Sequence, residues 1–208
     1  MRIASILENQ EIEKRVAITP EIANKYVALG FEVTLSKNYA VHLGINDKKY
    51  TDEGVKFFKD ENEVINDSNV IVQLGLMSDE KSSMLKENQT LIGVLNPFDN
   101  KDKLDSFVKR KINIFSLELL PRITRAQSMD ILSSQANLAG YKAVIDSFAN
   151  FKKAIPMMMT AAGTVPAAKV LVVGAGVAGL QAIATAKRMG AIVFSTDVRM
   201  ASKEQVES

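Results

Sequence analysis

The feature that most constrains the fold is a run of apolar residues that leads directly into closely spaced glycines. Lys169–Val173 has the composition of a buried strand. Gly174, Gly176 and Gly179 follow it with the spacing G-x-G-x-x-G, and the helix-like segment Leu180–Met189 comes next. A strand, a glycine turn and a helix in this order are typical of a parallel βαβ unit, whose turn leaves backbone amides free to bind phosphate.

Each glycine of this loop has a separate expected role. We expect Gly174 to allow the tight turn, Gly176 to let a pyrophosphate approach the backbone, and Gly179 to allow close packing of helix on strand. Ala175 and Val177 lie between them and complete the expected binding loop. The alternative is a glycine-rich turn in an α/β domain that binds nothing.

An acidic residue follows the glycines at the distance that a dinucleotide site needs. The next apolar run, Ala191–Ser195, leads to Asp197, about twenty residues beyond the loop. A carboxylate there binds the adenosine ribose hydroxyls and repels a 2′-phosphate, which favours NAD(H) over NADP(H). Arg199 could accept a 2′-phosphate and leaves NADP(H) open.

Short apolar runs alternate with helix-like segments along the whole chain, which predicts the α/β fold class. We expect two Rossmann-like parallel-sheet domains joined by a long helix, the second incomplete at the C-terminus. The expected limits are 1–125 for an N-terminal α/β domain, 126–150 for the connecting helix and 151–208 for a partial NAD(H)-binding domain. The expected strands are Ile3–Leu7, Glu32–Leu35, Val70–Leu74, Thr90–Leu95, Ile112–Phe115, Lys169–Val173 and Ile192–Ser195.

Helix boundaries carry recognisable signals in two places. Thr19 and Pro20 are typical of a helix start, and this helix should run to Leu29. A longer helix is expected from Ala126 to Asn150. Met157–Met159 is expected to pack in a core, because methionine fills irregular gaps.

Composition excludes several classes of function. The 26 basic and 24 acidic residues give a formal charge of +2 without a basic cluster, so no nucleic-acid partner is expected. The chain has no cysteine and one histidine, His42, so we expect no thiolate or metal site and no Ser-His-Asp triad. Proline and glycine interrupt the most apolar window, Ala154–Ala168, and the N-terminus lacks a signal-peptide pattern, so direct membrane insertion is not expected.

The expected long helix carries a polar stripe. Gln127, Asp130, Ser134, Asn137 and Tyr141 share one helical face, and residues of this kind are less typical of a solvated surface than Lys and Glu. We therefore expect this stripe to line a cleft, although most polar stripes face solvent. A second face, with Leu132, Ala136, Ala139 and Ala143, is expected to pack closely against a neighbouring element.

Three segments carry a resemblance to a known family. PRITRAQSMDILSSQANLAGY, IPMMMTAAGTVPAAKVLVVGAGVAGLQAIATAKRMGA and STDVR resemble the NAD(H)-binding domain of the alpha subunit of proton-translocating NAD(P) transhydrogenase. EKRVAITPE, residues 13 to 21, is shared with the related alanine dehydrogenases. The resemblance covers the whole chain, and RAQSMD is specific to the transhydrogenase branch.

The resemblance implies hydride transfer between NADH and NADP, coupled to proton translocation by membrane segments outside this chain. It places Arg122, Gln127, Asp130 and Ser133 around the nicotinamide, with Gln127 directed to the partner nucleotide. It implies a homodimer, with NADP(H) held by a partner domain and a separate membrane domain. The chain is then cytoplasmic and peripheral to the inner membrane through these partners.

Two other functions stay open. Alanine dehydrogenases resemble the chain too, but that family uses a lysine near position 73 and a histidine near position 96, where this sequence has Gln73 and Asn96. Without these groups, amino-acid oxidation lacks its general base. Because the sequence stops at Ser208, soon after the second strand of the nucleotide unit, a truncated remnant without activity is the other alternative.

Overall fold

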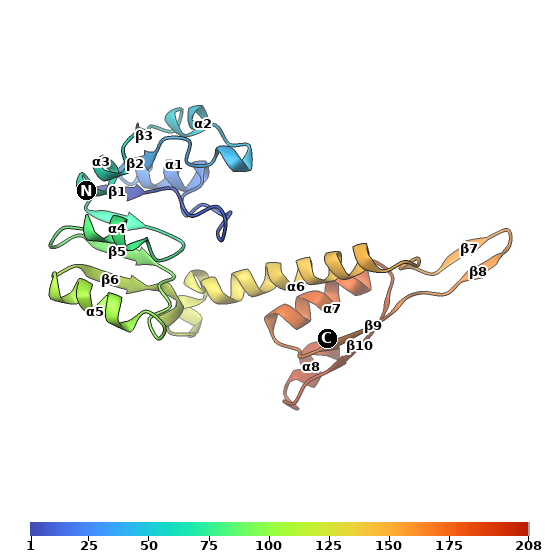
Figure 1. The fold of residues 1–208 in the computed structure, drawn as a ribbon. Coiled ribbons are helices and arrows are strands. Elements are labelled where there is room, and N and C mark those ends of the chain that lie inside the picture. Colours follow the sequence, from blue (N-terminus) through green and yellow to red (C-terminus); the bar gives the residue numbers. More distant parts are fainter. Residues whose placement is uncertain (208) are drawn as a thin grey trace. The chain divides into compact units, whose positions relative to one another are not determined.

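The computed structural model describes residues 1–207, which fall into two compact units, Met1–Met129 and the residues from Asp130 onward. The first unit contains a six-stranded parallel sheet, and the second contains two small sheets (Figure 1). Each unit is described by itself. None of the helices in residues 1–207 combines the length and the apolarity that crossing a membrane requires.

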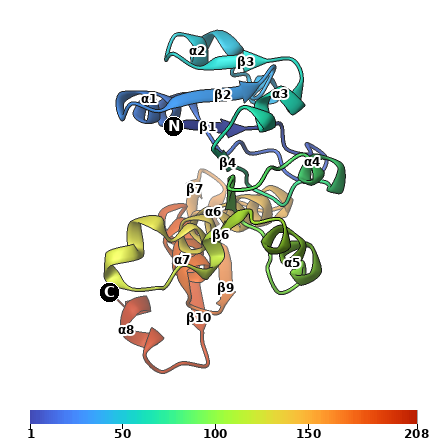
Figure 2. The same cartoon turned by 90° about the vertical axis from the view of Figure 1, so that its left-hand side faces the viewer.

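The sheet of the first unit has the strand order β3-β2-β1-β4-β5-β6, which is that of a doubly wound Rossmann fold. In Figure 2, β3, β2, β1 and β4 follow one another in this order. The strands are β1 (Arg2–Ser5), β2 (Glu32–Ser36), β3 (Lys56–Phe58), β4 (Val70–Val72), β5 (Thr90–Gly93) and β6 (Asn113–Ser116). The α/β class predicted from the sequence is confirmed, with β3 as an additional strand.

Five helices connect these strands. They are α1 (Pro20–Ala28), α2 (Asp47–Thr51), α3 (Glu61–Asn66), α4 (Asp79–Ser83) and α5 (Lys101–Lys109), and 3-10 turns occupy Val41–Leu43, Leu117–Leu119 and Thr124–Met129. Thr19 caps α1 by accepting a hydrogen bond from the Ile22 amide, and Pro20 stands at the first helical position, as the sequence predicts.

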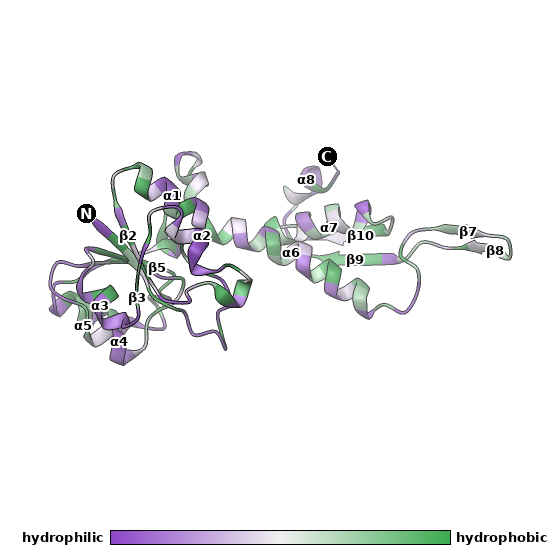
Figure 3. Ribbon diagram, turned by 90° about the horizontal axis from the view of Figure 1, so that it is seen from above, coloured by the Kyte–Doolittle hydropathy of each residue, from purple (hydrophilic) through white to green (hydrophobic). Residues whose placement is uncertain are grey.

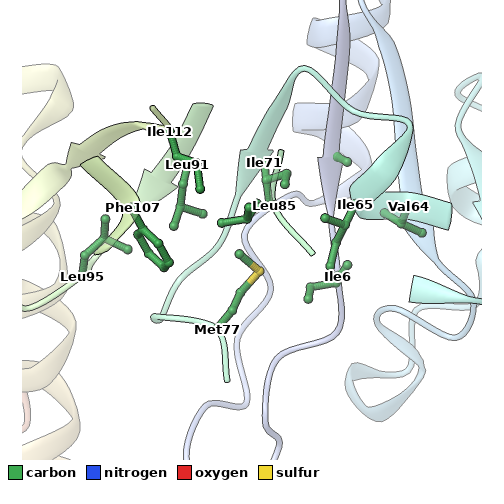
Figure 4. Packing of buried hydrophobic residues seen from close by; sticks show 11 residues of the cluster. Ile6, Val64, Ile65, Ile71, Met77, Leu85, Leu91, Leu95, Phe107 and Ile112 are labelled. Atoms are coloured by element: carbon green, nitrogen blue, oxygen red, sulfur yellow. The ribbon is translucent and has the colours of Figure 1, made fainter. Parts of the chain in front are cut away.

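Alternate residues of each strand enter two different cores, because successive side chains of a strand point to opposite faces of the sheet. Ile3 belongs to a cluster with Ile18 and Ala23 of the α1 region, whereas Ala4 belongs to a cluster with Val64 and Ile65 of α3. Figure 4 shows this second cluster, in which Ile71 and Leu91 of neighbouring strands lie with Phe107 of α5. Helices therefore cover both faces of the sheet.

The second unit begins with the long helix α6 (Ile131–Asn150), which packs on α7 (Val177–Arg188). Its parallel pair is β9 (Lys169–Val173) and β10 (Ile192–Thr196), paired in register from Lys169 with Ile192 to Val173 with Thr196. A short helix, α8 (Ser202–Glu207), follows.

One face of the β9–β10 pair is covered and the other is exposed. Val170, Val172 and Val193 pack against the cluster of α6 and α7 residues. Leu171 and Phe194 point the opposite way and are 66% and 53% exposed. Val173 and Ile192 lie on the same face and are 78% and 47% exposed, so the exposed face is largely apolar.

The structure corrects the expected start of the long helix. Residues 124–129 form a 3-10 turn, and the α-helix begins only after Asp130, whose carboxylate accepts a hydrogen bond from the Ser133 amide at 2.9 Å. Asp130 is therefore the N-cap, a position that its short acceptor side chain favours. Gln127 consequently does not share a helical face with Ser134 and Asn137.

The expected core position of the methionines is wrong. Met158–Thr160 (β7) and Gly163–Val165 (β8) form an antiparallel hairpin, which extends away from β9 in Figures 1 and 3. Met159 is 82% exposed in this hairpin. Gly163, which has a positive φ, lies in the tight turn that connects the two strands. The strands therefore pair with each other, and their side chains remain in solvent.

Candidate dinucleotide-binding site

The glycine loop joins β9 to α7 in the conformation that only glycine adopts easily. Gly174 has φ +96° and donates its amide to the Thr196 carbonyl at 2.7 Å, which ties the start of the loop to β10. A Cβ on Gly179 would lie 1.8 Å from the Gly174 oxygen. Both positions therefore exclude side chains for structural reasons.

Gly176 differs, because a Cβ added there would meet nothing within 4 Å. It is the N-cap of α7, and no side chain caps the helix there. The first amides of a helix have no intrahelical partner, and an open approach to them suits an anion. The loop thus offers unobstructed backbone amides at the positive end of the α7 dipole.

Asp197 is bound to the same loop. Its Oδ2 accepts a hydrogen bond from the Ala175 amide at 2.6 Å, and its side chain is only 10% exposed. Its Oδ1 accepts hydrogen bonds from the Arg199 amide at 2.8 Å and from Arg199 Nε at 3.1 Å. The Arg199 guanidinium first, and then the Ala175 amide, hold the pKa of the Asp197 carboxyl well below its usual range.

A cavity of about 360 Å³ opens beside this pair of residues. Asp197, Arg199 and Ala175 line it together with Ser195 of β10 and residues of α8. The Ser195 hydroxyl oxygen is buried and has no hydrogen-bond partner among residues 1–207. A buried hydroxyl without a partner is costly, so a ligand that reaches it gains a ready hydrogen bond.

These features fit the adenosine half of a dinucleotide. The cavity supplies a carboxylate for ribose hydroxyls and an unpartnered hydroxyl, and the adjacent loop supplies amides for a pyrophosphate. Ser195 was not among the residues singled out in the sequence. A serine inside an apolar strand was the signal that could have identified it.

The helix α6 contributes to the loop through Gly140, another residue that sequence reasoning missed. Gly140 is buried, and a Cβ there would lie 2.1 Å from the Ala178 carbonyl oxygen. The backbone of α6 therefore packs directly on the glycine loop. The sequence predicted close contact through Ala139 and Ala143, but both are exposed, because the helix faces α7 with Gly140 and Val144.

The four residues expected around the nicotinamide lie in different parts of the chain. Arg122 and Gln127 belong to the first unit and are exposed. Asp130 and Ser133 belong to the second unit and bind each other, with 2.7 Å between Ser133 Oγ and Asp130 Oδ2. This contact orients the hydroxyl and carboxylate at the N-terminus of α6.

Gln73 and Asn96 occupy the two positions at which oxidation of an amino acid would require basic side chains. Gln73 is buried, and its Oε1 accepts hydrogen bonds from the Ser5 hydroxyl at 2.8 Å and the Ile6 amide at 2.9 Å. Asn96 has φ +46°, and its backbone amide donates a hydrogen bond to Glu118 Oε1 at 2.6 Å. Neither side chain can act as a proton acceptor for an amine, because amides are not basic.

Family models match nearly the whole chain. The model described as "Alanine dehydrogenase/PNT, N-terminal domain" matches residues 6–139, and the model for the C-terminal domain matches residues 143–208. The chain belongs to the alanine dehydrogenase/PNT family.

Within this family, the transhydrogenases are more similar to the chain than the dehydrogenases are. An NAD(P) transhydrogenase subunit alpha of Rhodospirillum rubrum is 50% identical over 213 residues, which cover 100% of this chain and 56% of that protein. An alanine dehydrogenase of Methanococcus maripaludis is 26% identical over 189 residues, which cover 89% of this chain and 50% of that protein.

The fold agrees with a solved relative. The crystal structure of transhydrogenase from Sinorhizobium meliloti superposes with a TM-score of 0.92 at 45% identity, over 99% of this chain and 61% of that one. The chain spans 56% of the Rhodospirillum rubrum subunit and 40% of a longer transhydrogenase alpha subunit of Cereibacter sphaeroides, and thus only part of these relatives' length.

Proposed function

We propose that this chain provides the NAD(H)-binding part of an NAD(P) transhydrogenase. The supporting observation is that the Asp197 carboxylate binds the Ala175 amide of the glycine loop and that both residues line one cavity, next to the open position at Gly176. The 50% identity to a transhydrogenase alpha subunit supports the same branch of the family. In the whole enzyme, membrane segments outside this chain couple the reaction to proton translocation.

The adenosine half of NAD(H) binds to the second unit in this proposal. Gly174, Ala175, Gly176, Val177 and Gly179 form the binding loop, in which the amides at the start of α7 bind the pyrophosphate while the Gly174 and Ala175 amides stay bound to Thr196 and Asp197. Asp197 accepts hydrogen bonds from the ribose hydroxyls. Ser195 donates its free hydroxyl proton to the adenosine moiety. The ribose displaces Arg199 from Asp197, and the freed guanidinium lies at the mouth of the cavity.

Arg122, Gln127, Asp130 and Ser133 form the nicotinamide end of the site. The Asp130–Ser133 pair presents a hydroxyl and a carboxylate to a carboxamide, and Arg122 offers a fork of donors. Gln127 contacts the NADP(H) that a partner domain holds. Hydride passes from NADH to NADP⁺, giving NAD⁺ and NADPH, so the protein must orient two rings and exclude water.

The partners follow from the same proposal. A homodimer of this part of the enzyme docks an NADP(H)-binding domain, and both are attached to a membrane domain at the cytoplasmic side of the inner membrane. Gel filtration with light scattering measures the dimer. If the chain is monomeric at micromolar concentration, the proposed homodimer is wrong. The proposed nucleotide site is not affected by this result.

Calorimetric titration of the purified chain with NADH and with NADPH tests nucleotide binding. We expect NADH to bind more tightly, and no binding of either nucleotide at millimolar concentration contradicts the proposal. In a protein completed with its partner domains, Gln127→Asn should slow hydride transfer more than it weakens NADH binding. Equal loss of both would point to misfolding.

The rival activity is oxidation of alanine with NAD⁺. The amide side chains at Gln73 and Asn96 argue against it, because neither can accept the proton that amine oxidation releases. An assay with alanine and NAD⁺ decides between the two reactions. Turnover at an ordinary dehydrogenase rate would replace the transhydrogenase proposal.

A further inference from the structure

The helix α6 contacts the proposed nucleotide site at two points. Its N-terminus carries the Asp130–Ser133 pair, and its buried residue Gly140 packs on the glycine loop. Ser133 and Gly140 are seven residues apart, so they share one face of the helix and lie about 10 Å apart along its axis. Buried and half-buried residues follow this face at helical spacing, and they are Ser133, Ala136, Gly140 and Val144.

The two packed helices, α6 and α7, run in the same direction. Gly140 lies against Ala178 at the start of α7, and Val144 belongs to a cluster with Ala182, one turn further along α7. In Figure 1, α7 accordingly lies beside the second half of α6. The first half of α6 therefore extends past the start of α7. Unbonded amides point outward from a helix N-terminus, so those of α7 point towards the N-terminal end of α6.

The contact at Gly140 leaves no room for a side chain. A Cβ there would lie 2.1 Å from the Ala178 carbonyl oxygen, 2.8 Å from its carbonyl carbon and 3.0 Å from its Cα, which are all backbone atoms. Glycine in a helix interior is less stable than alanine, because its backbone loses more conformational freedom on folding. The close approach of the two backbones accounts for glycine at this position, and it fixes where α6 lies along α7.

The spacing of the two contacts suits one half of a dinucleotide. In NAD(H), a ribose and then the nicotinamide ring extend from the pyrophosphate. With the pyrophosphate at the start of α7, two turns of α6 run alongside this half of the molecule, from the loop to the Ser133 hydroxyl. A hydrogen bond tolerates only a few tenths of an ångström in the distance between its atoms, so the position of Ser133 relative to the loop matters.

We propose that Gly140 is a positioning residue of the NAD(H) site, which fixes the distance between the glycine loop and the Asp130–Ser133 pair. Its contact with Ala178 sets how far the N-terminus of α6 extends beyond the start of α7. The groups that bind the carboxamide are thereby in place when the pyrophosphate lies on the loop. Gly140 itself does not touch the nucleotide. This inference rests on the proposed function, because a dinucleotide is the ligand that reaches both contacts.

Calorimetric titration of the full chain with NADH and with ADP-ribose tests this role. ADP-ribose has the adenosine, the pyrophosphate and the second ribose of NADH but lacks the nicotinamide. Gly140→Ala pushes α6 away from the loop, so it should weaken NADH binding at least about tenfold more than ADP-ribose binding, as the loss of one or two hydrogen bonds provides. If both affinities fall by the same factor, Gly140 acts through the loop or the fold alone, and the proposal is wrong.

The same titration separates this inference from the proposed function. If the wild type binds neither NADH nor ADP-ribose, the nucleotide site itself is refuted. If the wild type binds both ligands and Gly140→Ala keeps their ratio of affinities, the nucleotide site stands and only the role of Gly140 is refuted.

Ser133→Ala identifies the end of the site that moves. The substitution removes the hydroxyl and keeps the backbone amide that donates to Asp130, so the helix cap remains. It should weaken NADH binding about tenfold and leave ADP-ribose binding unchanged. In the Gly140→Ala background it should have little further effect on NADH, because the hydroxyl no longer reaches the nicotinamide. Additive losses in the double variant overturn the proposal.

The matched control is Val144→Ala. Val144 is buried on the same face of α6, one turn after Gly140, and its truncation weakens the packing on α7 without adding an atom that separates the helices. This variant should unfold at a lower temperature than the wild type and keep the wild-type ratio of NADH to ADP-ribose affinity. A ratio altered as much as in Gly140→Ala would show that any loosening of α6 has this effect, which refutes a specific role of Gly140.

A measurement on the wild type decides the question if Gly140→Ala does not fold. In an NMR titration of the ¹⁵N-labelled chain, both ligands should shift the Gly176 amide, and NADH alone should shift the Ser133 amide. If NADH leaves the Ser133 amide unshifted, or if ADP-ribose shifts it equally, the nicotinamide does not lie at this end of α6. Gly140 then has no distance to fix, and the proposal fails.

Discussion

The carboxylate of Asp197 accepts a hydrogen bond from the backbone amide of Ala175, with 2.6 Å between Oδ2 and N. This bond joins the end of β10 to the middle of the glycine loop. The residue proposed to select the sugar thus also fixes the loop proposed to bind the pyrophosphate. Changes at Asp197 should therefore affect binding of both groups.

Asp197→Ala should weaken NADH binding by about tenfold or more, because hydrogen bonds to a charged group are stronger than those between neutral groups. It should weaken NADPH binding less, since the repulsion of the 2′-phosphate is removed and Arg199 becomes free. Calorimetric titration of both nucleotides measures the ratio of the two dissociation constants. Unchanged affinity for both nucleotides would remove Asp197 from the site.

The control for this variant is Asp146→Ala. Asp146 is exposed on α6, where it pairs with Lys142, and it lines no part of the cavity beside Asp197. The substitution removes the same charge from the second unit. We expect both dissociation constants to stay at the wild-type values.

Arg199→Ala should raise the preference for NADH over NADPH. Arg199 partly neutralises Asp197 and is itself 61% exposed, so its removal leaves the carboxylate to repel a 2′-phosphate without compensation. Exposed ion pairs are weak because solvent screens them, so the ratio should change by at most about fivefold. The charge-matched control is Arg188→Ala, which removes a positive charge from the last turn of α7, at the end opposite to the glycine loop. A lower preference for NADH in Arg199→Ala contradicts this account.

The sequence predicted the parallel strands well because their signals are local. Buried Val- and Ile-rich runs such as Val70–Val72 need no tertiary information to be recognised. The strand β3 was missed because Lys56–Phe58 is short and lies at the edge of the sheet. Its pairing with β2 depends on a neighbour that lies far away in sequence.

The candidate site was predictable only in part for the same reason. The glycines and Asp197 lie at fixed spacings, whereas Gly140 lies 34 residues before Gly174 and meets the loop only through helix packing. The ion pair of Lys81 with Glu61 likewise joins two different helices, α4 and α3, that lie twenty residues apart in the sequence. Pairing of this kind leaves no periodic pattern in the sequence.

Glu8 should make the stability of the first unit depend on pH. Burial first, and then Glu13, raise the pKa of its carboxyl above the ordinary value of 4.5, while the Leu74 and Gly75 amides and Lys81 oppose the shift. A carboxyl with a raised pKa in the folded state contributes stability at low pH that is lost as the pH rises through that pKa. Glu8→Gln should therefore gain stability relative to the wild type between pH 4 and pH 7.

Urea unfolding at pH 4 and pH 7, followed by tyrosine fluorescence, measures this change. Three of the four tyrosines, Tyr26, Tyr39 and Tyr50, lie in the first unit, so the signal reports mainly on it. Glu11→Gln is the control and should show the same pH dependence as the wild type. An equal difference between Glu8→Gln and the wild type at both pH values contradicts the assignment.

Gly176→Ala should separate binding from folding. Its φ of −78° suits any residue, and the added methyl group meets nothing within 4 Å, so the thermal unfolding temperature should stay near that of the wild type. The methyl group lies where the pyrophosphate must approach, so NADH binding should weaken at least about tenfold. Circular dichroism and calorimetry measure the two quantities. Wild-type affinity in this variant would exclude close approach of the ligand at Gly176.

Gly179→Ala and Gly140→Ala should show the opposite behaviour and lower the stability of the second unit. The added methyl groups would lie 1.8 Å from the Gly174 oxygen and 2.1 Å from the Ala178 oxygen, and backbone atoms cannot rotate away as a side chain can. Overpacking of this kind costs about 1–3 kcal/mol, which lowers the unfolding temperature by several degrees. The Gly140 variant is the more informative, because Gly140 lies on α6 and belongs to no nucleotide motif. If Gly140→Ala unfolds at the wild-type temperature, α6 does not pack on the loop through this residue. If the variant unfolds at a lower temperature and also binds NADH more weakly, α6 helps to hold the loop in its binding conformation.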